Sequence, residues 1–116
     1  MKTFDVRDGY LFVYYDEKND VNSLIELMTE VAEICKRKNI RKLLADLSNM
    51  QGEPRFLDRF TLGVSAVWIL RGISKTALVY RDVETNKFAE TVAVNRGLPT
   101  LVTHDIEIAK RWLGVE

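Results

Sequence analysis

The sequence predicts an α/β domain in which four helices connect the strands of one mixed, five-stranded sheet. Its 116 residues have the length of a single domain, which we expect to span residues 1–116. Short apolar runs of strand type alternate with stretches whose apolar residues repeat at helical spacing. An Asp-Gly pair separates the first two runs. The expected order is β-β-α-β-α-β-α-β-α, an N-terminal β-hairpin followed by a right-handed β/α superhelix.

The N-terminal part of the chain predicts the hairpin. Residues 3–6 and 10–15 are rich in β-branched and aromatic side chains, and Asp8-Gly9 lies between them. Asp-Gly favours a type I′ turn, which needs a positive φ at both central residues. We therefore expect the first two strands to pair antiparallel.

A long helix is predicted after residue 20. Asp20 suits the N-cap position, and Ser23 with Glu26 forms a competing capping box. The basic run 36–38 and Asn39 match the preferences of a helix C-terminus. The apolar residues at helical spacing are Val21, Leu24, Ile25, Met28, Val31, Ala32 and Cys35.

The middle of the chain predicts a buried strand and a second helix. Residues 42–47 form a nearly continuous apolar run, as is typical of a parallel strand covered by helices. A loop is expected at 48–53. Pro54 suits the first turn of the second helix, and Gly72 is expected to end that helix.

The last third of the chain continues the alternation. Residues 75–80 predict a buried strand, and residues 85–95 predict a third helix that ends before Gly97. Residues 99–102 predict a short last strand. Asp105 is expected to cap a final helix.

Composition excludes several classes of function. Lys+Arg and Asp+Glu both number 17, so the zero net charge argues against nucleic acid and acidic membranes as partners and leaves little repulsion against self-association. A single cysteine, Cys35, and a single histidine, His104, exclude a disulfide within the chain and the usual Cys and His-pair metal sites. We expect no metal or cofactor. We also expect no integral membrane association and a cytoplasmic location, since no apolar run is long enough for a membrane span or resembles a signal peptide.

Two stretches resemble the STAS domains. Residues 44–50, Leu-Ala-Asp-Leu-Ser-Asn-Met, resemble the "DLS-x-hydrophobic" strand end of these anti-sigma-factor-antagonist (SpoIIAA-like) proteins. Residues 88–99 and 103–113 resemble the C-terminal part of small bacterial SpoIIAA-like proteins of the STAS/SEC14 type. These proteins end in an "acidic-x-x-x-Ala-x-x-Trp-Leu" helix, matched here by Asp105, Ala109, Trp112 and Leu113. The resemblance implies the SpoIIAA-like fold.

The same resemblance implies three functions. The first is protein binding and regulation without catalysis. The second is the carriage of a lipid or small apolar ligand, as in SEC14-like relatives, which carry extra helices that this chain lacks. The third is the phospho-regulated anti-sigma-factor antagonist, in which a partner kinase modifies a hydroxyl at the start of the next helix. Residues 51–56 hold no Ser or Thr, and Ser48 is the nearest hydroxyl.

Polar residues follow three of the predicted parallel strands. Ligands of open α/β sheets bind outside the carboxyl ends of the strands, where helix N-termini also offer N–H groups to an anion. The groups at this edge are Asp46 and Ser48; then Tyr80, Arg81 and Asp82; then Thr103, His104 and Asp105. We predict a ligand- or partner-binding site formed by Asp46, Ser48, Arg55, Arg81 and His104.

Each of these residues also has a structural explanation. Asp105 suits a helix cap, Asp46 and Ser48 suit the pairing of loop backbone groups, and His104 suits an exposed surface position. Ser48, His104 and Asp46 could be arranged for nucleophilic catalysis, but no Gly-x-Ser-x-Gly elbow accompanies them. We therefore predict no catalytic residues.

The second predicted helix is apolar on most sides, so one stripe against the sheet cannot bury all of its side chains. The apolar side chains that the sheet cannot cover are expected to pack under the neighbouring loop, or to form an exposed patch for a second subunit, a partner protein or an acyl chain. We expect a homodimer. The rival carrier hypothesis predicts a cavity between the second and third helices and the sheet. The patch or pocket residues are Leu57, Phe60, Val64, Trp68 and Phe88.

Overall fold

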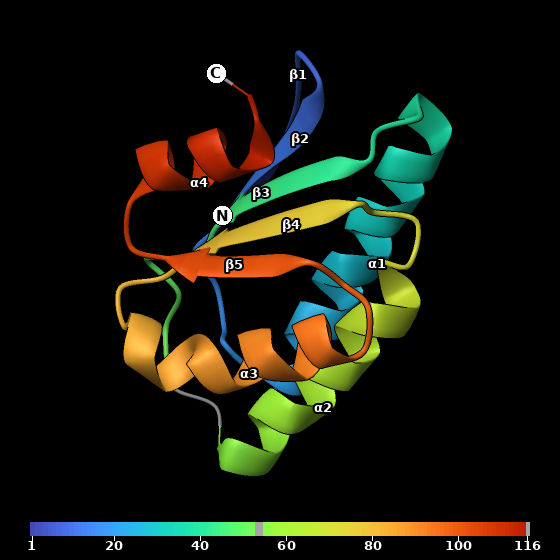
Figure 1. Cartoon of the computed structure of the whole chain (residues 1–116). Helices are drawn as coiled ribbons and strands as arrows, with labels where there is room; N and C mark the ends of the chain where they lie inside the picture. The colour runs from blue at the N-terminus through green and yellow to red at the C-terminus, as the bar shows by residue number, and fades with distance from the viewer. Residues whose placement is uncertain (53–54, 116) are drawn as a thin grey trace.

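The computed structural model describes residues 1–52 and 55–115 and confirms the predicted α/β architecture. Three helices cover one face of a five-stranded sheet, and a fourth helix covers the other face (Figure 1). The elements are β1 (Lys2–Arg7), β2 (Tyr10–Tyr15), α1 (Val21–Lys38), β3 (Lys42–Asp46), α2 (Phe56–Ile69), β4 (Lys75–Val79), α3 (Val83–Asn95), β5 (Thr100–Thr103) and α4 (Ile106–Leu113).

The sheet is mixed, and its strand order follows the chain, β1-β2-β3-β4-β5. β1 pairs antiparallel with β2, whereas β2, β3, β4 and β5 are parallel to one another.

The predicted type I′ turn at Asp8-Gly9 is wrong. Gly9 has a φ of 84°, but Asn39 is the one non-glycine residue with a positive φ in the described part of the chain. Glycine takes this conformation without the steric cost that an aspartate would meet.

The helix ends follow the predicted caps, with small shifts in boundaries. The Asp20 side chain accepts a hydrogen bond from the Ser23 N–H at 2.8 Å, so Asp20 rather than Ser23 caps α1. Asn39 is left-handed, with a φ of 56°, and ends α1. α2 ends at the cap residue Leu70, ahead of Gly72, and Pro54 lies outside the described residues. α3 begins at Val83, two residues before the start predicted at residue 85.

Loss of the α4 cap has a predictable cost. The Asp105 carboxylate accepts hydrogen bonds from the N–H groups of Glu107 at 2.8 Å and Ile108 at 3.4 Å. Asp105→Ala is expected to lower the free energy of unfolding by about 1 kcal/mol, because two helical N–H groups lose their acceptor. Urea titration measures the change. Asp105→Asn keeps a capping oxygen and should stay close to wild type; an equal loss in both variants would contradict the cap.

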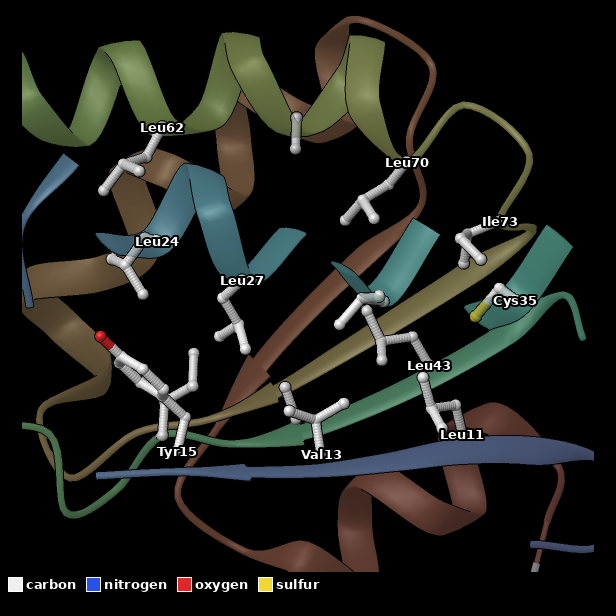
Figure 2. Packing of buried hydrophobic residues seen from close by; sticks show 14 of the residues in the cluster. Leu11, Val13, Tyr15, Leu24, Leu27, Cys35, Leu43, Leu62, Leu70 and Ile73 are labelled. Atoms are coloured by element: carbon white, nitrogen blue, oxygen red, sulfur yellow. The ribbon is translucent and has the colours of Figure 1, made fainter. Parts of the chain in front are cut away.

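The two faces of the sheet bury separate cores. Strand residues alternate between the faces, so Leu43 and Ala45 of β3 pack toward α1 and α2, whereas Leu44 packs toward α4. Figure 2 shows Leu11 and Val13 of β2 on the α1 side of the sheet. This covering of both faces accounts for the continuous apolar run at residues 42–47.

The chain carries no helix that is long and apolar enough to cross a membrane, within residues 1–52 and 55–115.

Candidate functional site

A polar cleft of about 340 Å³ lies at the carboxyl ends of the parallel strands, at the sheet edge that the sequence predicts. The loops that follow β2, β3 and β4 form its walls, with contributions from α2 and α3. Its lining consists of Asn19, Leu47, Ser48, Met50, Gly52, Arg59, Tyr80, Arg81, Asp82 and Asn86. The cleft is therefore the candidate site for a ligand.

Hydrogen bonds between loops shape this cleft. The Asn19 N–H donates to the Gln51 carbonyl at 2.9 Å, and the Gln51 N–H donates to the Glu17 carbonyl at 3.0 Å. Arg81 donates through Nη2 to the Met50 carbonyl at 3.4 Å. The segment after β3 is thereby tied to both neighbouring loops.

The structure brings together only two of the five predicted edge residues. Ser48 and Arg81 line the cleft. Asp46, Arg55 and His104 are not among the described lining residues. The Arg55 side chain is 86% exposed and pairs with Asp58 at 3.3 Å, while His104 is exposed beyond the end of β5.

Asp46 acts on its own loop. Its Oδ1 accepts hydrogen bonds from the Ser48 hydroxyl at 2.6 Å and from the Ser48 N–H at 3.1 Å. This is the structural explanation foreseen for these two residues. A nucleophilic serine would donate its proton to a histidine nitrogen, whereas Ser48 donates to a carboxylate.

Sequence reasoning missed three polar side chains of the cleft, those of Asn19, Arg59 and Asn86. Arg59 offered a signal, because a basic residue lies within an otherwise largely apolar helix and had to face either solvent or a polar site. Asn19 and Asn86 lie near helix starts, where asparagine is common, so no sequence signal distinguishes them as site residues.

An interior cavity of about 100 Å³ adjoins the cleft, between the sheet and helices α1, α2 and α3. The two spaces share Asn19, Leu47, Arg59, Tyr80 and Asn86. The other lining residues are mostly apolar: Val13, Leu24, Leu27, Met28, Val31, Leu43, Ala45, Leu62, Gly63, Ala66, Leu70, Thr76, Leu78, Ala89, Ala93, Leu98 and Thr100.

The cavity matches the predicted position but not the predicted lining. Phe60, Val64, Trp68 and Phe88 are not among its described lining residues. α2 instead turns Leu62, Gly63 and Ala66 inward, and Figure 2 shows Leu62 and Leu70 pointing from α2 toward the sheet. Small residues on this face let α2 and α3 approach closely and leave space above the sheet.

The outer face of α2 carries the predicted apolar patch. Leu57 is 71% exposed and Trp68 is 67% exposed. Phe60 is 39% exposed, and its ring lies 6.4 Å from the Phe88 ring and 5.5 Å from the Arg96 guanidinium carbon. Val64 and Phe88 are half-buried. We call Leu57, Phe60, Val64 and Trp68 the α2 face.

The Tyr80 hydroxyl and the Cys35 thiol predict a loss of stability at alkaline pH. Burial raises the pKa of Tyr80 from 10.0 to about 12, against an opposing effect of Arg59, and burial raises the pKa of Cys35 from 9.0 to about 11. Between these values the unfolded chain loses protons that the folded chain keeps. The free energy of unfolding should therefore be constant below pH 9 with respect to these groups and fall from pH 9 to about 12.

Tyr80→Phe separates the two contributions. Urea titrations at a series of pH values should show that this variant loses less stability than wild type above pH 10, because only the Cys35 contribution remains. An identical alkaline decline in both proteins would show that Tyr80 ionises as readily in the folded chain as in the unfolded one.

Comparisons with known proteins identify the fold. No family model matches the chain, and no curated protein matches it. A solved structure from Shewanella loihica PV-4, described as an uncharacterized protein from the DUF3478 family with a SpoIIAA-like fold, is similar, with a TM-score of 0.61. The similarity covers 97% of this chain and 92% of that chain at 20% sequence identity. The chain therefore has the SpoIIAA-like fold that the resemblance to STAS domains predicts.

Proposed function

We propose that this chain is a non-enzymatic, STAS-like binding and regulatory domain that acts through protein–protein interaction, with a second copy of itself on the α2 face. The observation that carries the proposal is the exposure of Leu57 and Trp68, two large apolar side chains on one helix. Such clusters on a soluble domain mark sites of association.

The spacing of these residues makes the α2 face continuous. Leu57, Val64 and Trp68 lie seven and four residues apart, so their side chains fall on one stripe of the helix. No member of the stripe is charged, and the chain as a whole has zero net charge. Two copies can therefore meet through this face in a two-fold arrangement without opposing like charges at its centre.

Side chains of α3 cover the β5 edge of the sheet, which disfavours a dimer formed by pairing of β5 strands. The Val102 N–H donates to Glu90 Oε2 at 2.6 Å, and Lys87 Nζ donates to the Val102 carbonyl at 3.3 Å. Edge strands blunted in this way resist pairing with another chain. The α2 face is therefore a better candidate than the β5 edge for contact between copies.

The experiment is light scattering after size exclusion over a range of concentrations. Wild type should have twice the mass of the chain, and Trp68→Lys should have the mass of one copy, because a buried charge opposes the apolar contact. Ile108→Lys is the matched control, since Ile108 is 38% exposed on α4 beyond the other face of the sheet, and this variant should remain dimeric. A wild-type monomer at every concentration would refute the dimer.

The interior cavity supports a second candidate, a carrier of a small apolar ligand of the SEC14 type. Its volume of about 100 Å³ is below the ~150 Å³ of an engineered cavity that binds benzene, so the cavity as it stands admits a short tail rather than a lipid acyl chain. Native mass spectrometry of freshly purified protein tests this candidate. A retained small molecule would support it, and bare protein would count against it.

A further inference from the structure

We infer that the cleft and the interior cavity together form one binding site for a short aliphatic 2-hydroxycarboxylate. This site is separate from the α2 face and does not depend on dimer formation. The carboxylate and hydroxyl would lie in the cleft, and the aliphatic tail would enter the cavity.

The cleft is polar and the cavity is mostly apolar, as a molecule with a polar head and an aliphatic tail requires. Residues shared by both spaces, among them Asn19, Arg59 and Tyr80, surround the passage from one to the other. Inside the passage the wall is formed by side chains such as Leu24, Leu62 and Leu78. Ligand sites of this kind combine an apolar interior with a few polar groups that fix orientation.

Charged groups of both signs lie at the cleft. Arg59, Arg81 and Asp82 line it, and the Asp46 carboxylate lies directly behind Ser48, at 2.6 Å from the Ser48 hydroxyl. Because carboxylates accompany the guanidinium groups, the cleft suits a monoanion better than a dianionic phosphate. The planar guanidinium group of arginine also fits the two oxygens of a carboxylate.

One polar atom at the passage calls for a ligand with a hydrogen-bonding group. Asn19 Oδ1 is buried and has no hydrogen-bond partner among the described residues. Buried polar atoms are rarely left unpaired in proteins. Asn19 Oδ1 accepts hydrogen bonds, so a carboxylate alone would repel it, whereas a hydroxyl on the adjacent carbon would donate to it.

The cavity volume limits the tail. Each water-sized group occupies roughly 30 Å³, so about 100 Å³ holds about three such groups. A branched tail of three carbons, as in 2-hydroxy-3-methylbutanoate, fills this space. A tail of six or more carbons exceeds it.

Isothermal titration with a ligand series tests the inference. From lactate to 2-hydroxybutanoate to 2-hydroxy-3-methylbutanoate, affinity should rise about fourfold for each added carbon, and it should fall for 2-hydroxyoctanoate. 3-Methylbutanoate, which lacks the hydroxyl, and the amide of 2-hydroxy-3-methylbutanoate, which lacks the charge, should each bind about tenfold more weakly. No saturable binding at millimolar concentrations, or equal binding of the amide, would overturn the inference and leave water as the occupant.

Variants locate the binding in the cleft. Arg81→Gln should weaken binding of 2-hydroxy-3-methylbutanoate about tenfold, because a charged hydrogen-bond donor is lost. Arg55→Gln is the matched control and should bind as wild type does, since Arg55 is exposed and lies outside the cleft lining. An equal loss in both variants would place the ligand elsewhere. Trp68→Lys should bind as wild type does, which separates this inference from the proposed dimer.

Discussion

Replacing Leu113 with alanine is expected to lower the free energy of unfolding by about 3 kcal/mol, within the 2–5 kcal/mol range for buried leucines. Leu113 is fully buried on α4, in the same cluster as Leu44, Ala77 and Ala109. α4 is the one described helix on this face of the sheet, so its neighbours have few other side chains with which to fill the cavity that the truncation leaves.

Urea titration of Leu113→Ala and Ile108→Ala measures this contribution. Ile108 lies on the same helix and is 38% exposed, so its truncation should change the free energy of unfolding by at most about 0.5 kcal/mol. A loss below 1 kcal/mol for Leu113→Ala would mean that α4 is not docked on the sheet as described.

Gly63→Ala is expected to lower the free energy of unfolding by about 2 kcal/mol, although alanine normally favours a helix by about 1 kcal/mol over glycine. A Cβ atom at Gly63 would lie 2.9 Å from Val92 Cγ1, 3.0 Å from Val92 Cβ and 3.3 Å from the Ala89 carbonyl oxygen. Two of these atoms belong to a buried side chain and the third to the backbone, so α2 and α3 must separate to admit a methyl group.

Gly72→Ala is the matched control for this contact. A Cβ at Gly72 would meet no atom within 4 Å among the described residues, and we expect this variant to be neutral or slightly stabilised. Adding Val92→Ala should reduce the cost of Gly63→Ala, because the Cγ1 contact is removed. If Gly63→Ala were as stable as Gly72→Ala, the close approach of the two helices would be refuted.

Much of the fold could be predicted from the sequence because local signals and burial agreed. Asp20 and Asp105 cap helices as their positions indicate, and Asn39 takes the left-handed conformation that ends α1. The run at residues 42–47 indicates a strand covered on both faces, and helices cover both faces. The turn at Asp8-Gly9 was the exception. A type I′ turn needs a positive φ at both central residues, and only Gly9 of the two has one.

The candidate site was less predictable because it depends on the directions of side chains. Asp46 ends β3 but turns to Ser48 rather than into the cleft. α2 is apolar on most sides, so periodicity could not select its inner face. Packing selected it, with Gly63 and Ala66 toward the interior and Trp68 outward, and this rotation also brought Arg59 to the cleft.

The central claim is that the α2 face is buried between two copies of the chain. Trp68 reports this burial directly in a Trp112→Phe background, where Trp68 is the remaining tryptophan of the two in the sequence. Its fluorescence emission should move to shorter wavelength as concentration rises through the monomer–dimer transition, because the 67% exposed indole leaves water. Emission typical of an exposed indole at every concentration would contradict the claim.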